Sequence, residues 1–265
     1  MNLEPVNFTP TNQPGTIDGN TIWFRAGRGP TFLGKVGSIF HSIKELFKSI
    51  FSRPTSAHEN PLTAAQVKLL RTPGRQLTGP ATQTAFETIG INERSKVIES
   101  LYVSDRSRVT ERTTAESIMA SINGTLSFMN PAPNDPISIP IVLGNNGPIE
   151  SRHIVTILIK DGQVEYYDPK GISSAERPLA NGETLYKVLD LCRERFLGDD
   201  GKILEHTNTH QYDTYQCGVY SAHFLYQRLI QNVAPETFNQ TNYDRTYIRE
   251  FRHWLADQIE DTPVL

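Results

Sequence analysis

Hydrophobic residues recur at helical spacing in residues 32–51. The apolar positions fall three and four residues apart, as on one face of a helix, and lysines occupy other positions. They are Phe32, Leu33, Val36, Ile39, Phe40, Ile43, Leu46, Phe47, Ile50 and Phe51. The pattern predicts an amphipathic helix that either covers a core or contacts a membrane surface or a partner groove. We favour core packing, because most amphipathic helices of soluble proteins serve it.

The chain divides into three predicted parts. Residues 1–31 are rich in Pro, Gly, Asn and Thr without a sustained period, which predicts a disordered leader. Residues 32–81 hold the amphipathic helix, followed by linker-like sequence around a short helix at 64–70. The main domain is predicted at 82–265.

Two apolar runs near the middle of the chain predict a hairpin. Residues 137–143 are β-rich, and residues 154–160 are apolar on both faces, as in a buried strand. Asp161-Gly162 then separates that strand from 163–167, and such a dipeptide between strands is a strong hairpin signal.

Helical patterns surround these strands. They cover residues 84–89, 93–101, 113–122, 183–196, 218–232 and 247–259. The sequence therefore predicts an α+β fold, with helices packed on a small mixed, largely antiparallel sheet.

Composition excludes several classes of protein. The net charge of −3 and pI near 6.2 give no sign of a nucleic-acid partner. Two cysteines are too few for a disulfide scaffold, which favours a reducing compartment. We find neither a secretory signal nor an apolar stretch of spanning length. His206 and His210 lie in a predicted strand or loop without a third ligand, so no metal or cofactor is expected.

The hairpin places a histidine near a carboxylate. If Lys160 faces Gln163, Asp168 lies opposite Val155, on the face that His153 shares. A carboxylate beside a histidine orients the ring and stabilises its protonated form, as a general base requires. Each residue taken alone is as well explained by a structural role.

Cys217 lies where a polar stretch gives way to helical spacing. The positive end of a helix dipole favours the thiolate, which is the attacking form. Its backbone N–H could stabilise an oxyanion, with Gln211 or Gln216 as the second donor. The alternative is a small buried hydrophobic residue, the role we assign to Cys192.

These residues together resemble the ubiquitin-like-protein proteases of the Ulp1/SENP type, which belong to the cysteine protease clan CE. The resemblance rests on "IPIVL" at 139–143, "HI" at 153, "EYYDPKG" at 165–171 and "QYDTYQCG" at 211–218. It departs from the family pattern at Ile154, where that family has tryptophan, and at Gln216, where an aspartate often stands.

The resemblance implies a role for each site residue. Cys217 would be the nucleophile, His153 the general base and Asp168 its orienting partner. Gln211, six residues before the cysteine, would be the oxyanion donor. The substrate would be ubiquitin or a relative such as SUMO or NEDD8, cleaved after its terminal Gly-Gly.

The two departures suit a divergent bacterial member of the clan. We therefore expect a monomeric effector that reaches the host cytoplasm by a route without a cleaved signal. Two alternatives stay open at this point. One is a YopJ-like acetyltransferase of the same clan, which uses acetyl-CoA and inositol hexakisphosphate. The other is a catalytically silent module that binds a ubiquitin-like protein.

Overall fold

The computed structural model describes residues 61–261, apart from residues 73, 78, 99, 104–112 and 145–151. The predicted leader and the predicted helix at 32–51 lie outside the described residues, and so does the membrane or partner contact expected of that helix. In the part of the chain that is described, no helix combines the length and the apolarity needed to cross a bilayer.

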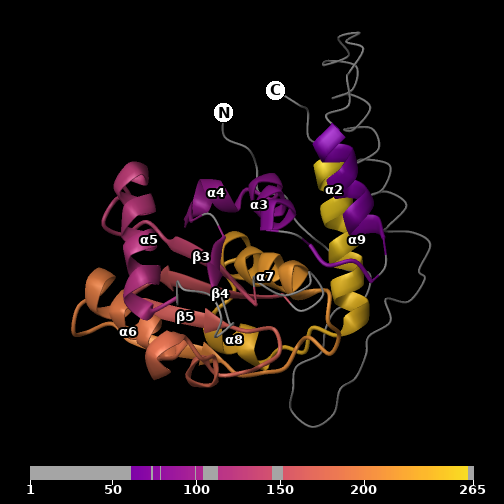
Figure 1. The fold of residues 1–265 in the computed structure, drawn as a ribbon. Coiled ribbons are helices and arrows are strands. Elements are labelled where there is room, and N and C mark those ends of the chain that lie inside the picture. The colour runs from indigo at the N-terminus through magenta and orange to yellow at the C-terminus, as the bar shows by residue number, and fades with distance from the viewer. Residues whose placement is uncertain are drawn as a thin grey trace.

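A mixed sheet lies at the centre of the fold, with six strands in the described ranges (Figure 1). They are β1 (Lys96–Val97), β2 (Leu101–Val103), β3 (Ile137–Leu143), β4 (His153–Lys160), β5 (Gln163–Tyr167) and β6 (Lys202–His206). The order is β1-β3-β4-β5-β6, and β2 also pairs with β3. The central strands β3, β4 and β5 are antiparallel, whereas β1, β2 and β6 are parallel to their neighbours.

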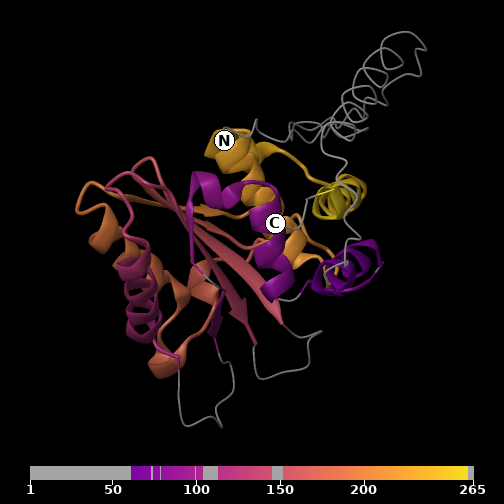
Figure 2. The same cartoon turned by 90° about the horizontal axis from the view of Figure 1, so that it is seen from above.

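Helices cover both faces of this sheet. The α-helices of the described ranges are α2 (Pro61–Arg71), α3 (Gly79–Thr88), α4 (Ile91–Arg94), α5 (Ala115–Met129), α6 (Leu185–Phe196), α7 (Cys217–Leu225), α8 (Pro235–Gln240) and α9 (Arg245–Asp261). Helices α5 and α6 lie on one side, and α3, α7 and α8 lie on the other (Figures 1 and 2). The predicted α+β fold class is confirmed.

The predicted hairpin and its register are confirmed. Lys160 pairs with Gln163, and Thr156 pairs with Tyr167. Asp161 and Gly162 both adopt positive φ, at 51° and 74°, which is the backbone that a two-residue type I′ turn requires. Local turn chemistry therefore fixes which residues stand at the open end of the hairpin.

The helix predicted at 93–101 is wrong. Helix α4 ends at Arg94, and Ser95 is extended with φ −151° and ψ 150°. The chain then forms β1 and β2, which pair in parallel with β3. The β-branched and aromatic residues here find a strand edge to pair with, and this tertiary contact overrides the local helical spacing.

Helix α7 is buried along its whole length. It continues into a π-helical turn, Tyr226–Ile230, and packs between the sheet and helices α3 and α9. Leu70 and Leu77, which precede the predicted start of the main domain, belong to the same core. The segment between α2 and α3 is thereby held close to the first turn of α7.

Candidate active site

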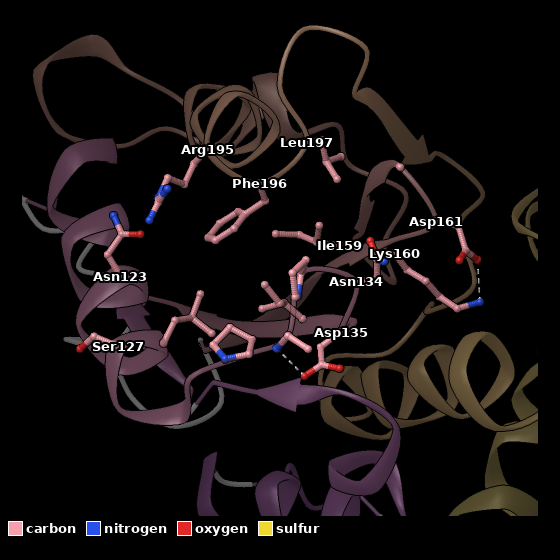
Figure 3. A pocket seen from close by; sticks show the side chains of 16 residues that line it. Asn123, Ser127, Asn134, Asp135, Ile159, Lys160, Asp161, Arg195, Phe196 and Leu197 are labelled. Carbon is pink, nitrogen blue, oxygen red and sulfur yellow. Dashed lines mark hydrogen bonds and ion pairs between the residues drawn. The ribbon is translucent and has the colours of Figure 1, made fainter.

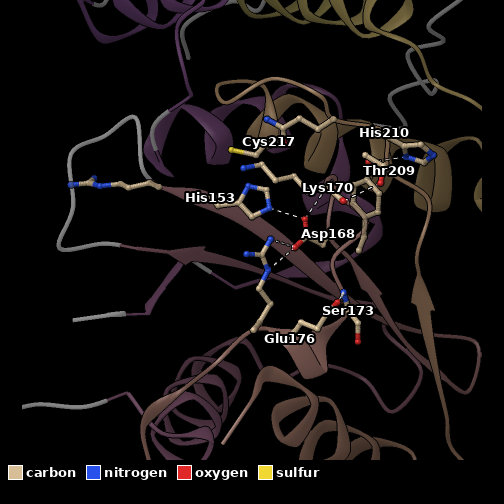
Figure 4. Close-up of polar contacts among 12 residues, drawn as sticks. His153, Asp168, Lys170, Ser173, Glu176, Thr209, His210 and Cys217 are labelled. Carbon is tan, nitrogen blue, oxygen red and sulfur yellow. Dashed lines mark hydrogen bonds and ion pairs between the residues drawn. The ribbon is translucent and has the colours of Figure 1, made fainter. Parts of the chain in front are cut away.

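Three residues predicted from the sequence meet at one end of the sheet (Figure 4). His153 begins β4, Asp168 follows the last residue of β5, and Cys217 begins α7. His153 Nε2 lies 2.7 Å from Asp168 Oδ1, which leaves Nδ1 as the ring nitrogen available to the thiol. The structure therefore places the imidazole between a carboxylate and a sulfur.

Asp168 is held rigidly by its hydrogen-bond donors. It is fully buried, and its Oδ1 accepts from the backbone N–H of Lys170 at 2.8 Å. Oδ2 accepts from Arg177 Nε at 2.8 Å and also from Arg177 Nη2. Burial raises the pKa of Asp168, but His153, Arg177 and the Lys170 amide outweigh it, so the net pKa is lowered. The carboxylate stays ionised and fixed in orientation.

Arg177 is a site residue that the sequence analysis missed. It follows the short 3-10 turn Ser174–Glu176, and nothing in the local pattern links it to Asp168. An Asp-Pro-Lys-Gly turn after a strand, followed within ten residues by an arginine, is too common to identify such a clamp from one sequence.

The charged form of His153 is favoured. Burial acts to lower the pKa of the ring, but the hydrogen bond to Asp168 and the contact with Cys217 raise it more. The net pKa of His153 is therefore above its ordinary value. The shift favours the ion pair in which the ring carries the proton that the thiol has lost.

Cys217 is correspondingly acidic. Only 1% of the residue is exposed, and this burial acts to raise the pKa of the thiol. The interactions with His153, the backbone N–H of Ile154 and the amide of Gln76 outweigh burial, so the pKa of Cys217 is lowered. Cys192, which has no such neighbours, has a pKa raised to about 12 by burial. The thiol pKa values of the two cysteines are thus shifted in opposite directions.

The loop before α7 is organised around Asp213. Gln211 Nε2 donates to Asp213 O at 3.0 Å and to its Oδ1 at 3.1 Å. Gln216 Nε2 donates to Asp213 Oδ2 at 2.6 Å. Both amide groups that the sequence offered as oxyanion donors therefore face Asp213, and the oxyanion role of Gln211 stays a prediction.

A different glutamine reaches the sulfur. Gln76 Nε2 lies 3.2 Å from Cys217 Sγ and 2.6 Å from the backbone oxygen of Arg152. Gln76 comes from the segment between α2 and α3, which the sequence analysis read as linker. Because this contact spans 141 residues, no local spacing signals it.

The two histidines considered as metal ligands have partners within the core. His206 Nε2 lies 3.1 Å from Glu165 Oε2, and His210 Nδ1 lies 3.1 Å from the hydroxyl of Tyr167. Within the described ranges, no group of three or more His, Cys, Asp or Glu residues is arranged to hold a metal ion.

A pocket of about 630 Å³ lies at the opposite, turn end of the β4–β5 hairpin (Figure 3). Lys160 and Asp161 of the hairpin line it, together with Asn123 from α5 and Arg195 and Phe196 from α6. It contains neither a cysteine nor a histidine, so the nucleophilic chemistry of the described residues belongs to the other end.

Comparisons with known proteins give resemblances of fold. No protein-family model and no curated protein sequence matches the chain. Among solved structures, the SUMO protease Ulp1 with an oxidised catalytic cysteine aligns over 82% of this chain and 92% of its own, at 18% identity and a TM-score of 0.47. The ASFV pS273R protease aligns over 87% and 92%, at 17% identity and a TM-score of 0.46.

The Chlamydia trachomatis effector ChlaDUB1 is also similar, over 80% of this chain and 97% of its own, at 8% identity and a TM-score of 0.42. All three TM-scores lie below 0.5. The chemistry of this chain lies in its own site, where a buried carboxylate, an imidazole and a thiol of lowered pKa are in contact.

Proposed function

We propose that the protein is a cysteine protease that cleaves the bond after the C-terminal Gly-Gly of ubiquitin or a ubiquitin-like modifier. The observation that carries the proposal is the position of His153 between buried Asp168 and Cys217. The Cys217 thiolate attacks the carbonyl carbon, and His153 gives its proton to the leaving amine. Water, deprotonated by His153, then hydrolyses the thioester and restores the thiol.

The burial of the nucleophile supports a substrate of this shape. Only 1% of Cys217 is exposed, so little space beside the sulfur is open to a bulky side chain next to the scissile bond. A Gly-Gly tail has no side chains there and enters as an extended, narrow chain. We propose ubiquitin as the preferred modifier, with SUMO and NEDD8 as the competing ones. The sequence resemblance supports action as a monomeric bacterial effector in the host cytoplasm.

The test is covalent capture by ubiquitin, SUMO and NEDD8 that carry a C-terminal vinyl electrophile. The expected adduct forms on Cys217, as located by peptide mass spectrometry, and Cys217→Ala abolishes it. Cys192→Ala is the matched control and should react like the wild type, because the Cys192 thiol is buried without a base. A folded wild-type protein that none of the probes modifies would refute the protease and favour a silent binding module.

A second candidate is acetyl transfer of the YopJ-like kind. A pocket of about 400 Å³ beside the start of α7 favours it. Arg71, Arg245, Arg249 and Arg252 line this pocket together with His253. Such a gathering of cations suits a polyphosphate, and inositol hexakisphosphate is the one that YopJ-like enzymes use.

The two candidates are separated by their co-substrates. Acetyl transfer predicts that labelled acetyl-CoA with inositol hexakisphosphate acetylates the protein on Cys217, and that calorimetry detects binding of the polyphosphate. Arg249→Gln would weaken that binding without touching the triad. Absence of both signals, together with capture by a ubiquitin-like probe, would leave hydrolysis as the function.

A further inference from the structure

The thiol of Cys217 has a hydrogen-bond partner from a distant part of the chain. Gln76 is only 8% exposed, and its Nε2 donates both to Cys217 Sγ and to the backbone oxygen of Arg152. The acceptor at residue 152 is one residue before His153, so the Gln76 amide lies between the start of β4 and the sulfur of Cys217. A neutral amide donor beside a thiolate stabilises the negative charge without competing for the proton.

We propose that Gln76 is a catalytic residue whose amide N–H stabilises the negative charge of the reaction, first on Cys217 Sγ and then on the substrate oxygen. This inference rests on the proposed reaction at Cys217. As Sγ bonds to the carbonyl carbon, the charge moves to an oxygen one bond beyond that carbon. A donor already beside Sγ is close to that oxygen and joins the Cys217 backbone N–H in an oxyanion hole.

The neighbouring groups favour Gln76 for this role over the glutamines of the preceding loop. The amide nitrogens of Gln211 and Gln216 both donate to Asp213. Gln76 Oε1 is buried without a hydrogen-bond partner among the described residues, as is Gln211 Oε1, but of these two amides Gln76 is the one that contacts the sulfur. Because a buried, unpaired amide oxygen is unfavourable, a backbone N–H of an incoming peptide is its natural partner.

The position of Gln76 is secured from helix α9. Arg252 is 4% exposed and donates to four backbone oxygens of the segment that leads to Gln76. These oxygens belong to Leu69, Leu70, Thr72 and Arg75, at distances of 2.6 to 3.4 Å. One guanidinium thus fixes the backbone up to the residue before Gln76. We assign Arg252 as a positioning residue.

The first turn of α7 accommodates this segment through a glycine. A side chain at Gly218 would meet Thr82 Oγ1 at 2.8 Å and Leu77 Cβ at 3.1 Å. The missing Cβ therefore allows the residue after Gln76 to pack directly beside the residue after Cys217. Contacts on both sides of the glutamine, from α9 and from α7, hold the amide at the sulfur.

The experiment compares Gln76→Leu with a matched control, Gln83→Leu on α3, whose amide donates to Glu87, and with Gln211→Leu, which removes the competing oxyanion candidate. The first readout needs no substrate: the rate at which iodoacetamide alkylates Cys217, followed by mass spectrometry at pH values below the midpoint of the wild-type profile, where the rate is proportional to the thiolate fraction. Loss of a hydrogen bond to a charged sulfur should slow alkylation by about tenfold in Gln76→Leu alone. The second readout is hydrolysis of a ubiquitin-like C-terminal amide, for which kcat should fall by about 100-fold with KM nearly unchanged.

Thermal unfolding checks that each variant is folded. If Gln76→Leu is not, Gln76→Met replaces it, because an unbranched side chain of similar length fills the site without an N–H donor and should slow alkylation to the same extent. The inference would be overturned if Gln76→Leu kept the alkylation rate and the kcat of the wild type. It would also be overturned if kcat fell in Gln211→Leu and in no other variant. Slower alkylation in Gln76→Leu without hydrolysis of any substrate by the wild type would refute the proposed function and retain the thiolate role of Gln76.

Discussion

At the residue scale, the acidity of one buried thiol depends on a chain of charged contacts. The Cys217 thiolate is stabilised by His153, the His153 imidazolium by Asp168, and the Asp168 carboxylate by Arg177. Each link offsets a burial that would otherwise neutralise the group. Removing one member should therefore destabilise the charged form of every group after it in the chain, including groups that it does not contact.

Replacement of Asp168 by asparagine tests the second link. The amide has the same shape but no charge, so the His153 imidazolium loses its stabilising partner. We expect kcat to fall by about 100-fold, a typical share for a positioned acid–base group. Asp190→Asn is the control, because Asp190 pairs with Lys187 and Arg193 of its own helix α6 among the described residues and has no part in the triad. Equal losses in the two variants would contradict the role of Asp168.

The pH dependence of activity follows from the directions of the two pKa shifts. The pKa of Cys217 is lowered, so the thiolate is present below the ordinary thiol range. The pKa of His153 is raised, so the imidazolium persists above its ordinary range and is lost as pH rises further. We predict a bell-shaped kcat/KM profile with a plateau around neutrality, whose limbs belong to the coupled pair. A profile that rises only in the ordinary thiol range would contradict the ion pair.

The sequence was sufficient for the residues whose positions depend on local spacing. His153 and Asp168 followed from a hairpin register, and Cys217 from the start of a helix. Gln76 and Arg177 did not, because each approaches the triad along a path set by the packing of distant segments. The same limit applies to Gln211, whose amide is oriented by a loop that turns around Asp213.

At the element scale, the strands with a local turn signal were predictable and the edge strands were not. The hairpin of β4 and β5 is closed by Asp161-Gly162, which accepts few other conformations. Strands β1 and β2 are two and three residues long and exist through pairing with β3. Their residues also fit a helical pattern, so only the partner strand decides between the two structures.

The connection between α9 and the segment before α3 gives a prediction at this scale. Arg252→Lys keeps the charge, but a single ammonium group cannot reach four backbone oxygens. If Arg252 acts by positioning Gln76, the variant should lower kcat by about tenfold in the wild-type background and have little effect in Gln76→Leu. The kcat values of the double-mutant cycle provide the measurement. Independent, additive losses would show that Arg252 serves stability alone.

At the scale of the whole molecule, a buried charge cluster joins the sheet to the turn that follows α7. Arg228, in the turn after α7, forms two hydrogen bonds with Glu165 of β5, at 2.7 and 2.8 Å. His206 of β6 contacts the same carboxylate. Glu165 is fully buried, and despite that burial Arg228 and His206 lower its pKa. The cluster thus fixes the turn after α7, and with it the helix that carries Cys217, to strands β5 and β6.

Glu165→Gln should destabilise the protein by about 3–5 kcal/mol, because it leaves the Arg228 charge buried without a partner. Chemical denaturation measures the free energy of unfolding. In the double variant Glu165→Gln, Arg228→Met the uncompensated charge is gone, and part of the stability should return. If the double variant recovered no stability, the uncompensated charge of Arg228 would not be the cause of the loss, and side-chain packing would account for it.

The free energy of unfolding of the wild type should also decrease at low pH. The lowered pKa values of Glu165 and Asp168 contribute stability above the ordinary carboxyl range, and this stability is lost as pH falls through the lowered values. Glu165→Gln lacks one of these groups, so its stability should decline less steeply over that range. Parallel pH–stability curves for the two proteins would contradict this prediction.

The central claim is that Cys217 is a thiolate activated by His153. The most direct measurement is the ultraviolet absorbance of the thiolate as a function of pH, taken as the difference between the wild type and Cys217→Ala. Cys192 is silent across the neutral range, since its pKa is about 12. We predict that the wild-type thiolate forms at a pH below the ordinary thiol range and that His153→Ala moves this step above it, because burial then outweighs the remaining hydrogen bonds from the Ile154 N–H and the Gln76 amide. An ordinary thiol titration in the wild type, unchanged in His153→Ala, would contradict the claim.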